Sequence, residues 1–102
     1  PLKNRQESRQ IPFSKIYYIE VYEKKLYVRL KDREYCQHGT LEQIQQLLPK
    51  YFLRCHRSYI CNMNFVEKVR VSENELHLEG GIRVPLSRTY KSAIQNFFNE
   101  GI

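Results

Sequence analysis

An alternation of apolar and polar side chains over residues 26–30 is the feature that most constrains the fold of this chain. Aliphatic residues occupy every second position, the period of two that a half-buried β-strand requires. Residues 16–22, just before it, are rich in aromatic and β-branched types and contain no Gly or Pro. Three polar residues, Glu23, Lys24 and Lys25, separate the two runs. We therefore expect a β-hairpin with a polar turn.

Further short strands are expected along most of the remaining chain, and none of them is long. A strand over residues 34–38 ends at Gly39, and residues 65–71 and 75–79 suggest a second hairpin. Residues 82–86 alternate again after a Gly-Gly turn. Periodicity alone leaves a barrel, a sandwich and small stacked sheets open as architectures.

Two helices interrupt this pattern. Thr40 and Gln43 have the spacing of a capping box, and Pro49 is expected to end the helix that they begin. The apolar face of that helix comprises Leu41, Ile44, Leu47 and Leu48. A C-terminal helix is predicted from apolar residues at i, i+3, i+4, i+7 and i+8, counted from Tyr90. Its expected N-cap is Ser87 or Thr89, and Asn99 and Gly101 are expected to close it.

The length and composition fit one folded domain. A chain of 102 residues has apolar surface for a single core, and a hydrophobic content of 41% is too high for a disordered chain. Residues 1–10 contain one aliphatic residue, Leu2, and are interpreted as a linker or edge strand. The domain itself is assigned to residues 11–102.

The charge favours a polyanionic partner. Seventeen Lys and Arg against eleven Asp and Glu give a formal charge of +6 and a pI near 9.4. Nucleic acid is the leading partner class, although a modest excess of cations also serves solubility alone. No apolar run approaches the roughly 20 residues needed to cross a bilayer, and no signal peptide pattern is present, so we expect a cytoplasmic protein.

Cysteine and histidine offer no metal or disulfide pattern. Three Cys are an odd number without paired spacing, and the three His fall in separate predicted elements, so no cofactor or metal is expected. Cys55 adjoins Arg54, His56 and Arg57, cations that would make a thiol more reactive. Strand alternation nevertheless directs Cys55 to the core, which favours a buried and inert thiol.

Three blocks of sequence carry a resemblance to a known family. They are Ile16-Tyr17-Tyr18-Ile19-Glu20, then Phe52-x-Arg54-x-His56-Arg57-Ser58-Tyr59-x-x-Asn62, then Val84-Pro85-Leu86-Ser87-Arg88-x-Tyr90. Together they resemble LytTR DNA-binding domains, from about residue 11 onward. The middle block is the most specific, because it is long and chemically unusual.

The resemblance implies a mainly β fold with two short helices, in which small, mostly antiparallel sheets are stacked in an elongated arrangement. It further implies the output domain of a bacterial response regulator in a two-component system, of the kind that controls virulence, quorum-sensing, bacteriocin and competence genes. Such domains bind paired direct repeats in promoter DNA as dimers, with loops in successive major grooves. A receiver domain is expected upstream, which agrees with a chain that begins at Pro1 rather than Met.

The resemblance places DNA contacts in three segments, where this sequence supplies Lys24 and Lys25, then Arg54, His56 and Arg57, then Ser87, Arg88 and Lys91. Arg57 is the first candidate for base reading, since a guanidinium can bond guanine O6 and N7 together. His56 reads DNA or braces its loop, and Arg54 supports a phosphate or forms a salt bridge. Ser87 contacts DNA or serves as a plain N-cap. The first loop is shorter than in some relatives.

Structural roles are expected for two further residues, and three rival functions remain to be weighed. Asn62 and Tyr59 are expected to tie strand ends together, with Tyr59 packed in the core or bonded to a phosphate. One rival is an RNA or single-strand binder that stacks bases on exposed tyrosines. Another is a protein-interaction domain that happens to be basic. An enzyme is disfavoured, because adjacent strand residues such as Cys55 and His56 point to opposite faces.

Overall fold

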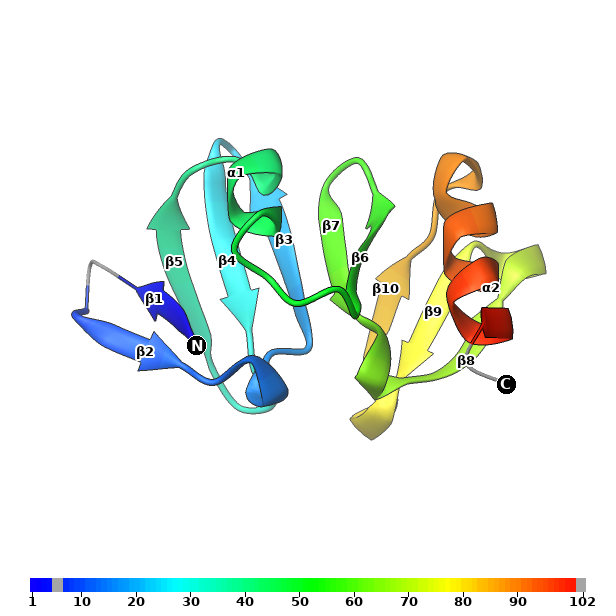
Figure 1. Ribbon diagram of the computed structural model, residues 1–102, viewed down its shortest axis with the longest axis horizontal. Coiled ribbons are helices and arrows are strands. Elements are labelled where there is room, and N and C mark those ends of the chain that lie inside the picture. The colour runs from blue at the N-terminus through cyan, green and yellow to red at the C-terminus, as the bar shows by residue number, and fades with distance from the viewer. Residues whose placement is uncertain (5–6, 101–102) are drawn as a thin grey trace.

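The computed structural model describes residues 1–4 and 7–100, in which ten strands form three antiparallel sheets (Figure 1). A two-stranded sheet pairs β1 (Leu2–Asn4) with β2 (Arg9–Ile11). The central sheet has the order β5-β4-β3-β7-β6, made of β3 (Tyr18–Tyr22), β4 (Lys25–Arg29), β5 (Glu34–His38), β6 (Phe52–His56) and β7 (Tyr59–Asn62). The third has the order β10-β9-β8, made of β8 (Val66–Arg70), β9 (Glu75–Leu78) and β10 (Arg83–Pro85).

Two α-helices and short 3₁₀ turns connect and cover these sheets. The α-helices are α1 (Leu41–Gln45), beside the central sheet, and α2 (Lys91–Glu100), beside the third sheet (Figure 1). The 3₁₀ turns are η1 (Phe13–Lys15), η2 (Met63–Phe65), η3 (Val71–Glu73), η4 (Glu79–Gly81) and η5 (Arg88–Tyr90). The sheets follow one another along a long axis, and the principal extents are 39 × 25 × 24 Å (Figure 1). The predicted elongated, mainly β arrangement is confirmed.

Local sequence signals account for several elements. The strand predicted over residues 34–38 coincides with β5, and the expected hairpins are β3–β4 and β8–β9. The capping box is present, since the Thr40 hydroxyl accepts from the Gln43 N–H at 3.1 Å and the Gln43 side chain accepts from the Thr40 N–H at 3.1 Å. Residues 2–4 pair with residues 9–11, and Leu2 is buried at 2% exposure.

One detail of the predicted helices is wrong, and another is confirmed in position only. α1 ends at Gln45, well before Pro49, because the next turn tightens: the Leu47 N–H donates to Ile44 rather than continuing the i to i−4 pattern. Leu47 consequently leaves the apolar face and is 65% exposed. At the second helix, Ser87 holds the N-cap position of η5, yet its side chain makes no capping hydrogen bond. The predicted closing residue Gly101 lies outside the described residues.

The described residues form two hydrophobic cores, and the β6–β7 hairpin contributes to both. The first core lies among β1, β2, the central sheet and α1, and it includes Phe52 and Ile60. The second lies between the hairpin, the third sheet and α2, and it includes Cys55 and Cys61. Alternate residues of one hairpin thus face opposite cores, so the hairpin is the wall between them. Within residues 1–4 and 7–100, no helix is long and apolar enough to span a bilayer.

Candidate nucleic-acid interface

The first cationic segment is the tight turn between β3 and β4. Tyr22 pairs with Lys25, so the turn has only Glu23 and Lys24 as central residues. Both have positive φ, 49° and 66°, as in the mirror-image turns that match the twist of a hairpin. Such turns favour Asn and Gly, so two longer side chains are held here in a strained backbone. Their side chains, with those of Tyr22 and Lys25, are exposed.

The second segment is the turn between β6 and β7, and Arg54 braces it. Arg54 donates from Nε to the carbonyl of His56 at 2.9 Å and from Nη2 to the carbonyl of Arg57. Its Nη1 lies 3.1 Å from the carboxylate of Glu42, so the salt bridge considered from sequence is present. A hydrogen bond from its own backbone and the Arg54 guanidinium lower the pKa of Glu42. Arg57 is left exposed at the tip.

A β-bulge shapes the end of β6. Arg54 pairs with Ile60 and His56 with Tyr59, so Cys55 is the extra residue on that strand. Its thiol is fully buried, and burial raises its pKa to about 12 despite the opposing charge of Arg54. The expectation of a buried thiol directed to the core is confirmed.

The third segment begins where β10 leads into η5 and α2. Arg88 is exposed, whereas Lys91 is partly buried and donates from Nζ to the carbonyl of Val71 at 3.2 Å. Among the described residues, the Ser87 hydroxyl makes no capping hydrogen bond. Arg88 is therefore the exposed cation of this segment, and Lys91 serves partly as a tie to η3.

Two backbone hydrogen bonds join the three segments. The Val21 N–H donates to the Ser58 carbonyl at 2.9 Å, which sets the β6–β7 turn beside the end of β3. The Ser87 N–H donates to the Cys55 carbonyl at 2.9 Å, which sets the start of η5 beside the end of β6. We call the resulting strip, made of residues 22–25, 56–58 and 87–88, the basic edge.

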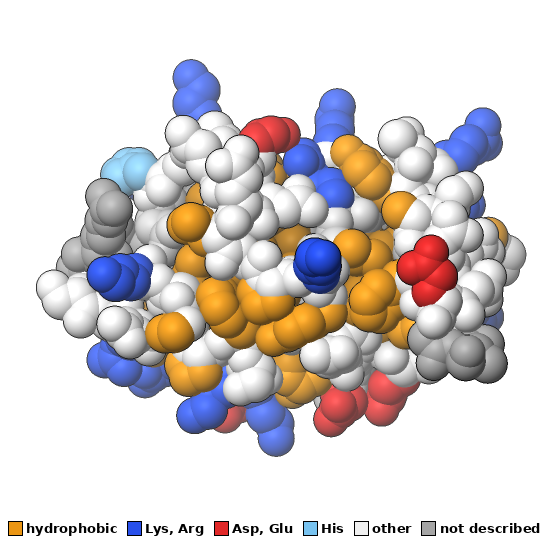
Figure 2. Space-filling model, viewed as in Figure 1, with side chains coloured by type: hydrophobic (Ala, Val, Ile, Leu, Met, Phe, Trp, Pro, Cys, Tyr) orange, Lys and Arg blue, Asp and Glu red, His pale blue; other side chains and the backbone are white. Residues whose placement is uncertain are grey.

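Cationic side chains stand out along the basic edge. Figure 2 shows Lys and Arg side chains projecting at three separated places along the upper outline, above the β3–β4 turn, the β6–β7 turn and the start of α2. The exposed cations of the edge are Lys24, Lys25, Arg57 and Arg88. Glu23 is its one exposed acid among the described residues. An array of this kind suits a long anionic surface.

Tyr22 is a residue of this edge that sequence reasoning missed. It belongs to the aromatic and β-branched run that predicted a strand, yet it is 60% exposed, because it is the last residue of β3 on the face that the first core does not cover. Its pairing with Lys25 sets an aromatic ring next to a cation. The neighbouring polar turn was the available signal, since a strand's last residue often leaves the core.

Tyr59 and Asn62 have the structural roles expected of them. Tyr59 packs against the second core, and its hydroxyl donates to the Glu20 carboxylate at 2.9 Å. Burial first, and the Glu20 hydrogen bond second, raise the pKa of Tyr59 to about 12. Asn62 is buried and donates to the Ile16 carbonyl at 2.9 Å, while its Oδ1 accepts from the Asn64 N–H.

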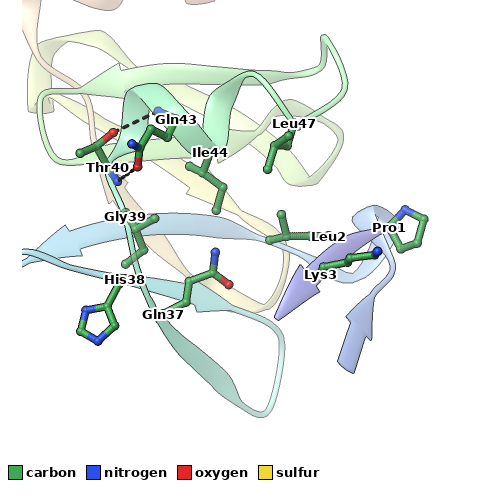
Figure 3. A pocket seen from close by; sticks show the side chains of 11 residues that line it. Pro1, Leu2, Lys3, Gln37, His38, Gly39, Thr40, Gln43, Ile44 and Leu47 are labelled. Atoms are coloured by element: carbon green, nitrogen blue, oxygen red, sulfur yellow. Dashed lines mark hydrogen bonds between the residues drawn. The ribbon is translucent and has the colours of Figure 1, made fainter. Parts of the chain in front are cut away.

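Two further features lie away from the basic edge. A pocket of about 690 Å³ opens between β1, β5 and α1, with Leu2, Ile44 and Leu47 forming apolar walls (Figure 3). At the end of η3 and along β9, ligand atoms of Glu73, Glu75 and His77 lie within 4.8 Å of one another. Both carboxylates are already in ion pairs, with Arg70 at 2.6 Å and Arg83 at 3.8 Å, which weakens them as ligands for a cation.

Comparison with known proteins defines the class. Residues 6–99 match the LytTr DNA-binding domain family, and the chain belongs to that family. The resemblance stated from sequence is thus confirmed, and the family is one of DNA-binding domains of transcription regulators.

Particular relatives support the assignment. The sensory transduction protein LytT of Bacillus cereus is 32% identical over 84 residues, which cover 78% of this chain and 34% of that protein. The transcriptional regulatory protein BtsR of Escherichia coli is 36% identical over 59 residues, which cover 55% of this chain and 24% of that protein. A solved LytTr DNA-binding domain of a putative methyl-accepting/DNA response regulator from Bacillus cereus has a TM-score of 0.79 and 35% identity, covering 86% and 84%. The chain spans about a third of the length of LytT.

Proposed function

We propose that this domain reads promoter DNA through its basic edge, with its turns entering successive major grooves on one face of the duplex. The observation that carries the proposal is the pair of backbone hydrogen bonds, Val21 to Ser58 and Ser87 to Cys55, which align three cationic segments. A major groove recurs about every 34–36 Å along DNA. The long axis of the whole domain, 39 Å, is of the same order as this repeat.

The contacts divide by chemistry. Arg57, exposed on a braced turn, is assigned to base reading, because its planar fork suits guanine O6 and N7. Lys24 and Lys25 are point charges that suit phosphates, and Arg88 adds a contact at the start of α2 with Ser87 as its polar neighbour. Arg54 acts through the carbonyls that it holds, so we assign it a positioning role.

The longer protein is proposed to be a cytoplasmic response regulator. The relatives LytT and BtsR are named as sensory transduction and transcriptional regulatory proteins, and the chain covers about a third and a quarter of their lengths. We propose a receiver domain upstream, and two copies of this domain on paired direct repeats. Virulence and quorum-sensing genes are the proposed class of targets.

Selection of bound sequences from random duplex DNA, followed by titration, tests the proposal. Arg57→Ala should lose preference for the selected site over random duplex, by about 1–3 kcal/mol if the contact is bidentate. Lys24→Ala should weaken binding to the selected and the random duplex alike. It should also reduce the salt dependence of the affinity by about one released counterion. Lys31→Ala is the matched control, because Lys31 is exposed in the β4–β5 connection, beyond the other end of β4. Equal wild-type affinity for selected and random duplex would refute the proposal.

A single-strand binder is the second candidate, and the 60% exposure of Tyr22 is the observation in its favour. Base stacking on such a ring tolerates any sequence. Affinities for duplex and single strands of one sequence, at equal salt, separate the two functions. Tighter single-strand binding that Tyr22→Ala abolishes would favour the second.

A further inference from the structure

One ring nitrogen of His56 is already engaged inside the protein. The Ser58 backbone N–H donates to His56 Nδ1 at 3.1 Å. A backbone amide can only donate, so Nδ1 must be unprotonated in this arrangement. A neutral imidazole with a bare Nδ1 carries its proton on Nε2. The turn therefore fixes the tautomer of His56 as the Nε2–H form.

The imidazole also packs against an aromatic ring, and the backbone of the same residue is braced. The imidazole and the Tyr59 ring form a T-shaped pair, with centroids 5.5 Å apart and the planes at 80°. The carbonyl of His56 accepts from Arg54 Nε at 2.9 Å. A donor fixed in this way loses little rotational freedom when it meets a ligand.

The Nε2–H group remains open to an outside acceptor. No residue among 1–4 and 7–100 is recorded as accepting a hydrogen bond from it, and His56 is only partly buried. Nδ1 and Nε2 lie on opposite sides of the ring, so Nε2 points away from the Ser58 amide. The residue that follows His56 in the chain is Arg57, which is exposed on the basic edge.

We propose that His56 is a DNA-contacting residue with two simultaneous roles: Nδ1 closes the β6–β7 turn, and Nε2–H donates to an acceptor on DNA. This inference rests on the proposed function of the basic edge. The ligand is a hydrogen-bond acceptor, either guanine N7 or a phosphate oxygen. Beside Arg57, which also only donates, His56 disfavours the N–H donors of adenine and cytosine at the same step.

Two substitutions separate the roles. In His56→Asn, the amide oxygen occupies the δ position and can accept from the Ser58 N–H, but no donor reaches the ε position. In His56→Gln, an amide N–H reaches the ε position, but no acceptor remains at δ. His77→Asn is the matched control, because His77 lies on β9 and contacts Glu75 rather than the basic edge.

The measurements are imidazole ¹⁵N chemical shifts, hydrogen exchange of the Ser58 amide, and affinity for the selected duplex. We expect the Nε2–H tautomer in the wild type. His56→Asn should keep the slow Ser58 exchange and lose about 3–10-fold in affinity, the equivalent of one hydrogen bond. His56→Gln should speed Ser58 exchange and lose less affinity than His56→Asn. His77→Asn should bind like the wild type.

Modified DNA then identifies the acceptor. With 7-deazaguanine in the site, the difference between wild type and His56→Asn should vanish if the acceptor is guanine N7. With a neutral methylphosphonate at one position, it should vanish if the acceptor is that phosphate. Either result supports the proposal and names the acceptor.

Three outcomes would overturn it. Wild-type affinity in His56→Asn would leave His56 as a turn cap only, and a protonated Nδ1 in the free domain would contradict the tautomer. In both cases the proposed function stands if the wild type still prefers the selected duplex. Absence of that preference in the wild type would overturn this inference together with the proposed function.

Discussion

Arg54 and Glu42 lie 3.1 Å apart, and through this ion pair α1 is fastened to the turn that holds Arg57. The same guanidinium holds the carbonyls of His56 and Arg57, so one side chain reaches three acceptors. The Arg54 side chain is 17% exposed and that of Glu42 is 72% exposed. The buried end of the pair is thus the one that shapes the turn.

Arg54→Lys should loosen the turn, because a lysine keeps the charge but has no planar fork to span the carbonyls. We expect the unfolding free energy to fall by about 1–2 kcal/mol, for the loss of one or two hydrogen bonds. Preference for the selected duplex should fall as well. Glu42→Gln serves as the control and should cost less, since it leaves both carbonyl contacts in place. Denaturant unfolding and duplex titration measure the two effects, and an unaltered Arg54→Lys protein would contradict the bracing role.

Lys24→Gly should stabilise the domain and weaken DNA binding. Relief of left-handed strain is worth about 1–2 kcal/mol and is partly offset by roughly 0.5–1 kcal/mol from the more flexible unfolded chain. We expect the unfolding free energy, measured with denaturant, to rise by about 0.5–1 kcal/mol. Glu23→Asn should also gain stability, and it should strengthen DNA binding because it removes an acid. If Lys24→Gly unfolds more easily than the wild type, the strain argument fails.

Alkylation should distinguish the three cysteines. Burial raises the pKa of Cys55 to about 12 and that of Cys61 well above its ordinary value, so neither forms a thiolate near pH 8. Cys36 is only partly buried. We expect iodoacetamide to modify Cys36 alone in the native domain and all three after denaturation, as counted by mass spectrometry. Native labelling of Cys55 would revive a redox role for it.

Tyr59→Phe should change how the domain responds to alkaline pH. The folded pKa of about 12 exceeds the unfolded value near 10, so the folded state retains the phenol proton longer. The associated stability is present below pH 10 and is lost between about pH 10 and 12. The unfolding free energy, measured with denaturant at intervals across this range, should therefore fall less steeply with pH in Tyr59→Phe than in the wild type. Parallel curves would show that the phenol does not contribute.

Elements specified by neighbouring residues were predictable from sequence. The capping box of α1 depends on Thr40 and Gln43, three positions apart, and the β3–β4 hairpin depends on alternation around a polar turn. The place of Cys55 in the core also followed from alternation. The stacking of small sheets was expected only from the family resemblance, because periodicity does not choose among β architectures.

Features that depend on distant contacts were not predictable. The three acceptors of Arg54 include Glu42, twelve residues away, and no local signal chooses that partner over water. The exposure of Leu47 follows from an early tightening of the chain after Gln45. The tautomer of His56 depends on the shape of the β6–β7 turn, which sequence described only as cationic.

The β6–β7 hairpin, which separates the two cores, has a consequence for how partial unfolding would affect DNA binding. Lys24 is carried by strands of the first core and Arg88 by the segment that closes the second, while Arg57 sits on the shared hairpin. If the C-terminal unit opened alone, the β3–β4 turn would persist while Arg88 was withdrawn. The affinity for DNA would then fall in two steps, as the proposed contacts were lost one set at a time. DNA binding would thus be linked to two separate folding equilibria, one for each core.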